Sequence, residues 1–196
     1  MENNDNKRNS NIQFYVRKTK KDLIEIVEAY DIDKIRIGFR SYGLDAEPGS
    51  RVRSGVDFYM PVPEFELLCH NLLSGNILAR LKAGREVEPI YKGSPRDGQI
   101  FSRAFYFNLS NRGLFFNAAE GPGKKSDTGA VKPLYKLNEA PSKVSISLDS
   151  DEIKSFALQG RRACDVYYMR MANDPMEGRV TGNMRKTLRT ILDKLG

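Results

Sequence analysis

The sequence is poor in the residues that most often build catalytic and metal centres. It has no tryptophan, one histidine (His70) and two cysteines among 196 residues. The cysteines, Cys69 and Cys164, form no Cys-x-x-Cys pair, and with one histidine they cannot supply the ligands of a typical zinc site. Each lies in an apolar helical pattern, so we expect two reduced core thiols. Neighbouring helical positions point in different directions, which speaks against a Cys69–His70 nucleophile pair. We therefore expect no enzyme, no metal and no cofactor.

Long hydrophobic runs are also missing. No stretch approaches the roughly 18 apolar residues that a membrane-spanning helix needs. The N-terminus, MENNDNKRNSN, is polar and lacks the apolar segment of a signal peptide. We expect residues 1–11 to be a disordered tail and the protein to be soluble and cytoplasmic, without a membrane partner.

Positive charge is in excess. Lys and Arg number 32 against 25 Asp and Glu, which gives a net charge of +7. Cations placed near a phosphate chain release condensed counterions, so the excess suits a polyanionic partner. Net charge alone does not establish such a partner. The question depends on whether the cations gather on one surface.

Residues 12–30 precede the clearest strands. Residues 12–16 are strand-prone, whereas apolar residues in 20–30 recur at the i, i+3, i+4 and i+7 positions of a helix. Thr19, followed three residues later by Asp22, resembles a capping box. We expect a helix over 20–30, with a strand as the alternative because the stretch is rich in β-branched residues.

Two stretches then alternate between apolar and polar residues, as half-buried strands do. They are residues 34–42 and 51–60, which we expect to pair as a hairpin with a basic outer face. A helix should follow over 63–82, continuing through Gly75. Residues 82–98 are of mixed charge and are expected to be a long loop.

The second half is richer in strands. We expect a hairpin of residues 99–109 and 113–120, then a connection over 118–129. An edge strand over 130–136 and a further strand over 143–149 should follow. The chain should end in two helices, one from Asp149 to about Met171 and a basic amphipathic one over 173–196. Strands grouped before helices predict an α+β fold with antiparallel sheets. We expect one domain over 12–172, in a strand-strand-helix and then a four-strand-helix order, followed by the C-terminal helix.

The stretch AAEGPGKKSDTG (118–129) invites comparison with a phosphate-binding loop. That motif reads G-x-x-x-x-G-K-[ST] and opens a helix. Here Ala118 replaces the first glycine, Lys125 replaces the Ser or Thr, and extended structure follows. We exclude a nucleotide loop and expect a flexible connection. The alternative is a basic finger in which Lys124 and Lys125 touch a polynucleotide backbone.

Cations lie beside aromatic rings on the strand faces that point away from the expected core. Cations can follow the phosphates of an unpaired strand while each base stacks on a ring, at about 1–3 kcal/mol per base. Arg103 and Tyr106 lie on opposite faces of their strand, so at most one joins a shared surface. The candidate nucleic-acid-binding residues are Lys34, Arg36, Arg40, Tyr42, Arg51, Arg53, Tyr59, Arg103, Tyr106, Phe115, Lys124, Lys125 and Lys132.

The segment KVSISLDSDEIKSFALQGRRA resembles the strand-to-helix end of single-stranded-DNA-binding proteins of the Whirly and transcriptional-positive-cofactor-four type. Residues 99–171 look like one Whirly half and residues 34–83 like a shortened one. The resemblance implies a Whirly-like fold of curved antiparallel sheets, single-stranded DNA as ligand and a homo-oligomer. The lysine-glycine-lysine-alanine motif of plant Whirly proteins is absent, so no binding residue is carried over.

The resulting expectation is a protein that binds single-stranded DNA with little sequence specificity, with RNA left open. A plain alternative is that the basic strand faces are only solvated. A functional alternative is a protein-interaction or assembly module that acts through the leucine stripe of the C-terminal helix, without nucleic acid.

Overall fold

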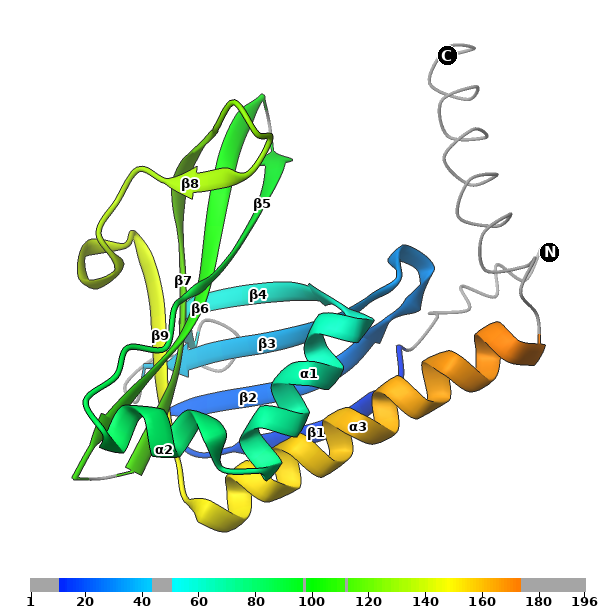
Figure 1. Cartoon of the computed structure of the whole chain (residues 1–196). Coiled ribbons are helices and arrows are strands. Elements are labelled where there is room, and N and C mark those ends of the chain that lie inside the picture. Colours follow the sequence, from blue (N-terminus) through cyan, green and yellow to red (C-terminus); the bar gives the residue numbers. More distant parts are fainter. Residues whose placement is uncertain (1–10, 44–50, 97, 112, 174–196) are drawn as a thin grey trace, which may run out of the picture.

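The computed structural model describes residues 11–43, 51–96, 98–111 and 113–173 (Figure 1). The first sheet contains β1 (Gln13–Lys18), β2 (Asp22–Ala29), β3 (Lys34–Tyr42) and β4 (Val52–Pro61). These strands are antiparallel and lie in the order β1-β2-β3-β4, with the short η1 helix (Tyr30–Ile32) between β2 and β3. The first sheet is therefore a simple meander.

The second sheet contains β5 (Ile90–Arg96), β6 (Gln99–Ser110), β7 (Gly113–Lys125), β8 (Val131–Pro133) and β9 (Ser142–Leu148), with η2 (Leu137–Glu139) before β9. β7 pairs with β6, and also with β9 along its first part and β8 at its end. Gly93 of β5 lies against Val131 of β8, so the end of this sheet curls strongly back on itself. All of these pairings are antiparallel.

Three α-helices complete the described chain: α1 (Val62–Leu73), α2 (Asn76–Lys82) and α3 (Ser150–Asn173). Figure 1 shows the strands of the two sheets running in crossing directions, with α1 and α3 packed beside the first sheet. The fold is thus α+β with two antiparallel sheets and a helix at the C-terminal end of the described residues, as the sequence predicts.

Aromatic side chains join these layers into one core. Phe105 of β6 contacts Phe39 and Phe58 of the first sheet, with ring centroids 5.7 Å apart in both pairs. Phe156 of α3 packs edge-on against Phe116 of β7, with centroids 5.2 Å apart. All five rings are fully buried. These rings cover the core-facing side of the first sheet. The opposite side of this sheet, here called the outer face, takes no part in these ring contacts.

The prediction of a helix over residues 20–30 is wrong, because Asp22–Ala29 is strand β2. Its Ile24 and Ile26 alternate into the core beside β3, and the energy of that packing outweighs the weak helical spacing. The hydrogen bond expected of a capping box at Thr19 does form, but it closes a turn and not a helix. The Thr19 hydroxyl oxygen accepts from the Asp22 N–H at 3.0 Å in the β1–β2 hairpin.

Three further corrections concern boundaries. Gly75, with φ of 72°, ends α1 and separates it from α2 instead of being passed by one helix. The expected loop over 82–98 contains strand β5, which pairs with β6. The expected connection over 118–129 is largely strand, because β7 extends to Lys125. Separately, because β1 and β2 precede β3 and β4, the first half is no shortened unit: it has four strands before its helices.

The predictions for the hairpins and for α3 are confirmed. β3 pairs with β4, and β6 pairs with β7 out to Ser110 and Gly113. At the start of α3, the Asp149 carboxylate accepts from the Glu152 N–H at 2.8 Å, and the Glu152 carboxylate accepts from the Asp149 N–H at 2.9 Å. Two predictions concern segments outside the described residues. Of the expected tail over 1–11 only residue 11 is described, and of the expected helix over 173–196 only Asn173 is described.

Candidate nucleic-acid interface

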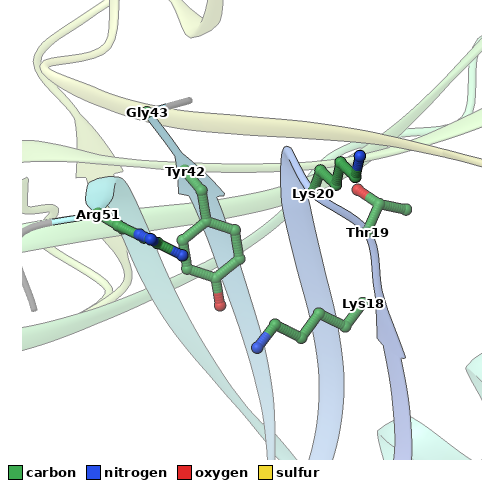
Figure 2. Close-up of a pocket in the computed structure, with 6 residues that line it drawn as sticks. All are labelled: Lys18, Thr19, Lys20, Tyr42, Gly43 and Arg51. Atoms are coloured by element: carbon green, nitrogen blue, oxygen red, sulfur yellow. The ribbon is translucent and has the colours of Figure 1, made fainter. Parts of the chain in front are cut away.

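A hollow lies at one end of the first sheet, where the β1–β2 turn meets the end of β3 and the start of β4 (Figure 2). We call it the basic hollow. It has a volume of about 690 Å³, within the range of roughly 300–1,000 Å³ typical of ligand sites. It is lined by Lys18, Thr19, Lys20, Tyr42, Gly43 and Arg51.

Backbone hydrogen bonds hold the three segments of the basic hollow together. The Tyr42 N–H donates to the Lys21 carbonyl at 2.8 Å, which ties β3 to the β1–β2 turn. The Gly43 N–H donates to the Arg51 carbonyl at 2.8 Å, which ties the end of β3 to the chain entering β4. Within the turn, the Lys21 N–H donates to the Thr19 hydroxyl oxygen at 3.1 Å. The side chains of the hollow thus project from a fixed backbone frame.

The basic hollow is positively charged around an aromatic ring. Three of its side chains are cations, and the lining contributed by the described residues contains no carboxylate. The Lys18 Nζ lies 5.9 Å from the centroid of the Tyr42 ring, which is a cation–π distance. Figure 2 shows Arg51 and Lys18 extending toward the Tyr42 ring from different sides, with Lys20 on the turn. In the described chain, neither Lys18 nor Lys20 forms an ion pair with a carboxylate, so an external anion can approach them without displacing one.

The middle of the same outer face has a different character. Glu25, Arg36, Arg40 and Asp57 form what we call the arginine–carboxylate cluster. Arg36 donates to Glu25 at 3.0 Å and to Asp57 at 3.4 Å. Arg40 donates to both carboxylate oxygens of Asp57, at 2.8 and 3.0 Å. The cluster has two positive and two negative charges and is formally neutral.

Two glycines make room for the arginine–carboxylate cluster. Gly38 lies in β3 directly between Glu25 of β2 and Asp57 of β4. A Cβ at position 38 would lie 2.7 Å from the Glu25 Oε1, and a Cβ at Gly55 would lie 2.9 Å from the Arg40 Cδ. Without side chains at these two positions, the charged groups can fold down across the sheet. The four side chains are accordingly only 15–32% exposed.

The remaining candidates of the first sheet flank these two regions. Tyr59 lies directly opposite Arg36, and Lys34 lies opposite Pro61, at the end of the sheet away from the basic hollow. Arg53 is exposed and lies one residue beyond Val52, the partner of Tyr42. The structure thus brings Tyr42, Arg51 and Arg53 to one end of the face and places Lys34 at the other.

Arg103 and Tyr106, the β6 candidates, face opposite ways, as the strand alternation predicts. Arg103 forms an ion pair with Glu120 of β7 and donates to the Ser94 hydroxyl at 3.0 Å. Tyr106 is only 6% exposed and packs with Ala104 and other residues in a small second core. Burial, and next the neighbouring Tyr91, raise the pKa of Tyr106. In this position Tyr106 offers no ring face on which a base could stack.

The last candidates lie on β7 and β8. Phe115 is half-buried and pairs with Asn108 across the hairpin. Lys124, Lys125 and Lys132 are exposed on the β7–β8 hairpin, and Lys124 lies directly opposite Lys132. They belong to the second sheet, whereas the basic hollow belongs to the first.

Sequence reasoning missed Lys18 and Lys20. Both belong to the run KTKK, which has three lysines in four residues. The helix predicted from residue 20 placed this run at a helix start and separated it from Tyr42. The hairpin instead places Lys18 over the Tyr42 ring. A strand assignment for 22–29, followed by counting of the hairpin register, would have brought the two together.

The described residues offer little for other chemistry. Cys69 and Cys164 are buried free thiols, as predicted. Burial raises the pKa of Cys69, and it raises the pKa of Cys164 to about 12, so neither is an activated nucleophile. Over the described ranges, no group of three or more His, Cys, Asp or Glu residues is arranged to hold a metal ion. None of the helices in this part of the chain combines the length and the apolar character needed to cross a membrane.

Comparison with known proteins gives no assignment. The sequence matches no protein-family model, and a search of curated proteins finds no match.

Proposed function

We propose that the protein binds single-stranded nucleic acid, with DNA preferred, and that the basic hollow is where binding is strongest. The observation that carries this proposal is the Lys18 amino group over the Tyr42 ring, with Lys20 and Arg51 lining the same hollow. In this arrangement an unstacked base lies on the ring while its flanking phosphates meet the cations. Binding in this mode depends on charge and stacking and carries little sequence specificity.

An unpaired strand suits this geometry better than a duplex does. A base in a duplex is already stacked on both sides, so it gains nothing from Tyr42 unless it is first unstacked. A duplex-reading protein also commonly presents a helix to the major groove. Here the buried residues of α1 and α3 pack into the core, and the cations of the hollow come from a turn and from strand ends.

The proposal is tested by fluorescence anisotropy with labelled single-stranded DNA, duplex DNA and RNA of equal length at two salt concentrations. We expect the single-stranded DNA to bind most tightly. The logarithm of its affinity should fall with the logarithm of salt at a slope of about −0.7 per phosphate contact, or roughly −2 for three contacts. Unchanged anisotropy for all three probes at low salt would contradict the proposal, and equal or tighter binding of RNA would redirect it to RNA.

Three other expectations belong to this proposal. They are a cytoplasmic location, a homo-oligomeric state, and a relation to the Whirly and transcriptional-positive-cofactor-four proteins. The alternative of an assembly module acting through residues 173–196 concerns a segment that lies beyond the described residues except for Asn173, so it stays a prediction.

A further inference from the structure

The basic hollow and the arginine–carboxylate cluster are neighbours on the same face. Tyr42 and Arg40 are two residues apart on β3, so their side chains leave the same face about 7 Å from each other. An unpaired strand carries one phosphate charge per nucleotide, so a strand held at Tyr42 brings its next phosphates near the following positions of β3. A strand that leaves the hollow along β3 therefore meets Arg40 and Asp57 next.

Asp57 occupies the position that a phosphate would take in this cluster. Its carboxylate accepts two hydrogen bonds from Arg40 and a longer one from Arg36. Both of the Arg40 bonds come from its Nη2, so two guanidinium groups converge on one carboxylate, and charge-assisted N–H···O bonds of the same kind hold phosphate oxygens. A phosphate can reach these guanidinium groups only by displacing Asp57, and it is repelled by that carboxylate as it approaches.

We propose that Asp57 sets the limit of the nucleic-acid-binding surface by filling the anion position between Arg36 and Arg40. This inference rests on the proposed function. In the wild-type protein the bound strand is confined to the basic hollow and its surroundings. Neutralising Asp57 opens a second phosphate site next to the first and lengthens the segment of nucleic acid that the protein holds.

The test compares wild type with Asp57→Asn, an isosteric change that removes the negative charge. The probes are labelled oligothymidylates of about six and about fifteen nucleotides, measured at several salt concentrations. We expect Asp57→Asn to bind the longer probe about five- to tenfold more tightly at low salt, with a salt slope steeper by about 0.7, as one added phosphate contact requires. The gain for the shorter probe should be smaller.

Asp31→Asn is the matched control. Asp31 is an exposed residue of η1, at the end of the first sheet away from the basic hollow, and its replacement makes the same change in net charge. A second variant, Glu25→Gln, removes the shorter of the two ion pairs of Arg36 and leaves the longer one with Asp57, so it should give a smaller gain than Asp57→Asn. It also provides a test that does not depend on the stability of Asp57→Asn, which is checked by thermal unfolding.

The outcomes separate this inference from the proposed function. Tighter binding and a steeper slope for Asp57→Asn, with Asp31→Asn like wild type, support it. If wild type binds single-stranded DNA but Asp57→Asn and Glu25→Gln match Asp31→Asn, the inference is wrong and the proposed function stands. If neither wild type nor any variant binds at low salt, both fail.

Discussion

The basic hollow and the arginine–carboxylate cluster lie on one face of one sheet, and both contain basic side chains next to tyrosines. They differ in their partners. Lys18 and Lys20 form no ion pair with a carboxylate in the described chain, whereas Arg36 and Arg40 are held by Glu25 and Asp57. A cation already paired with an internal carboxylate has less to gain from a phosphate. Counting the positive residues on a strand therefore overstates how many of them are open to an external anion.

The largest expected effect tests the hollow directly. The double variant Lys18→Ala/Lys20→Ala removes two of the proposed phosphate contacts and should weaken binding of single-stranded DNA by about 50-fold at low salt, with a slope shallower by about 1.4. Anisotropy measured over a range of salt checks this. The control, Lys82→Ala/Lys154→Ala, removes the same charge from α2 and α3 and should have little effect. Equal losses in the two double variants would mean that only the net charge matters.

The second prediction distinguishes the contribution of the Tyr42 ring to affinity from the contribution of the positive charges in the hollow. Tyr42→Ala should weaken binding by about tenfold, because a stacked base contributes roughly 1–3 kcal/mol. Tyr42→Phe retains the ring and should bind like wild type. Titration of both variants with the same labelled oligothymidylate checks the pair. Parallel losses in Tyr42→Ala and Tyr42→Phe would assign the contribution to the hydroxyl group and contradict stacking.

The third effect tests the cluster and should appear mainly in stability. Arg40→Ala leaves the half-buried Asp57 carboxylate without its main partner and should lower the free energy of unfolding by about 1 kcal/mol. Its effect on DNA affinity should be under about threefold, since Arg40 is already engaged. Chemical denaturation and anisotropy on the same protein samples measure the two quantities. A loss of binding as large as that of the lysine double variant would mean that Arg40 contributes to binding as much as the lysines of the basic hollow do.

The smallest effect concerns the second sheet. Lys132 lies directly across from Lys124 on exposed strands, and like charges in that arrangement are mildly destabilising. Lys132→Thr should therefore raise the free energy of unfolding by a few tenths of a kcal/mol, up to about 0.5. DNA affinity should change less than twofold if the hollow dominates. A marked loss of affinity would show that the β7–β8 hairpin is part of the binding surface.

Much of the fold could be predicted where a local signal and the tertiary structure agree. The alternation in residues 34–42 and 51–60 correctly predicts β3, β4 and their pairing, since a period of two suits only a half-buried strand. The capping box at Asp149 and Glu152 predicts the start of α3, because both hydrogen bonds lie within four residues. The isolated, apolar setting of Cys69 and Cys164 likewise predicts buried thiols.

Prediction failed where the deciding contact comes from elsewhere in the chain. Residues 22–29 fit a helical spacing, and it is pairing with β1 and β3 that makes them a strand. Because of that error the sequence did not predict the basic hollow, since Lys18 approaches Tyr42 only when β1 and β2 form a hairpin. The candidate list likewise could not distinguish Arg36 and Arg40 from cations without internal partners.

By itself, the sequence determined the balance of charge, the alternation that gives the strands a basic outer side, the local turns and caps, and the absence of a nucleotide-loop motif. These properties depend on composition or on residues within a few positions of one another. Only the tertiary structure decided which cations keep an internal carboxylate and which surround a ring. The reason is geometric: Glu25, Arg36 and Asp57 come from three strands, and their side chains meet only after the strands pair in one register.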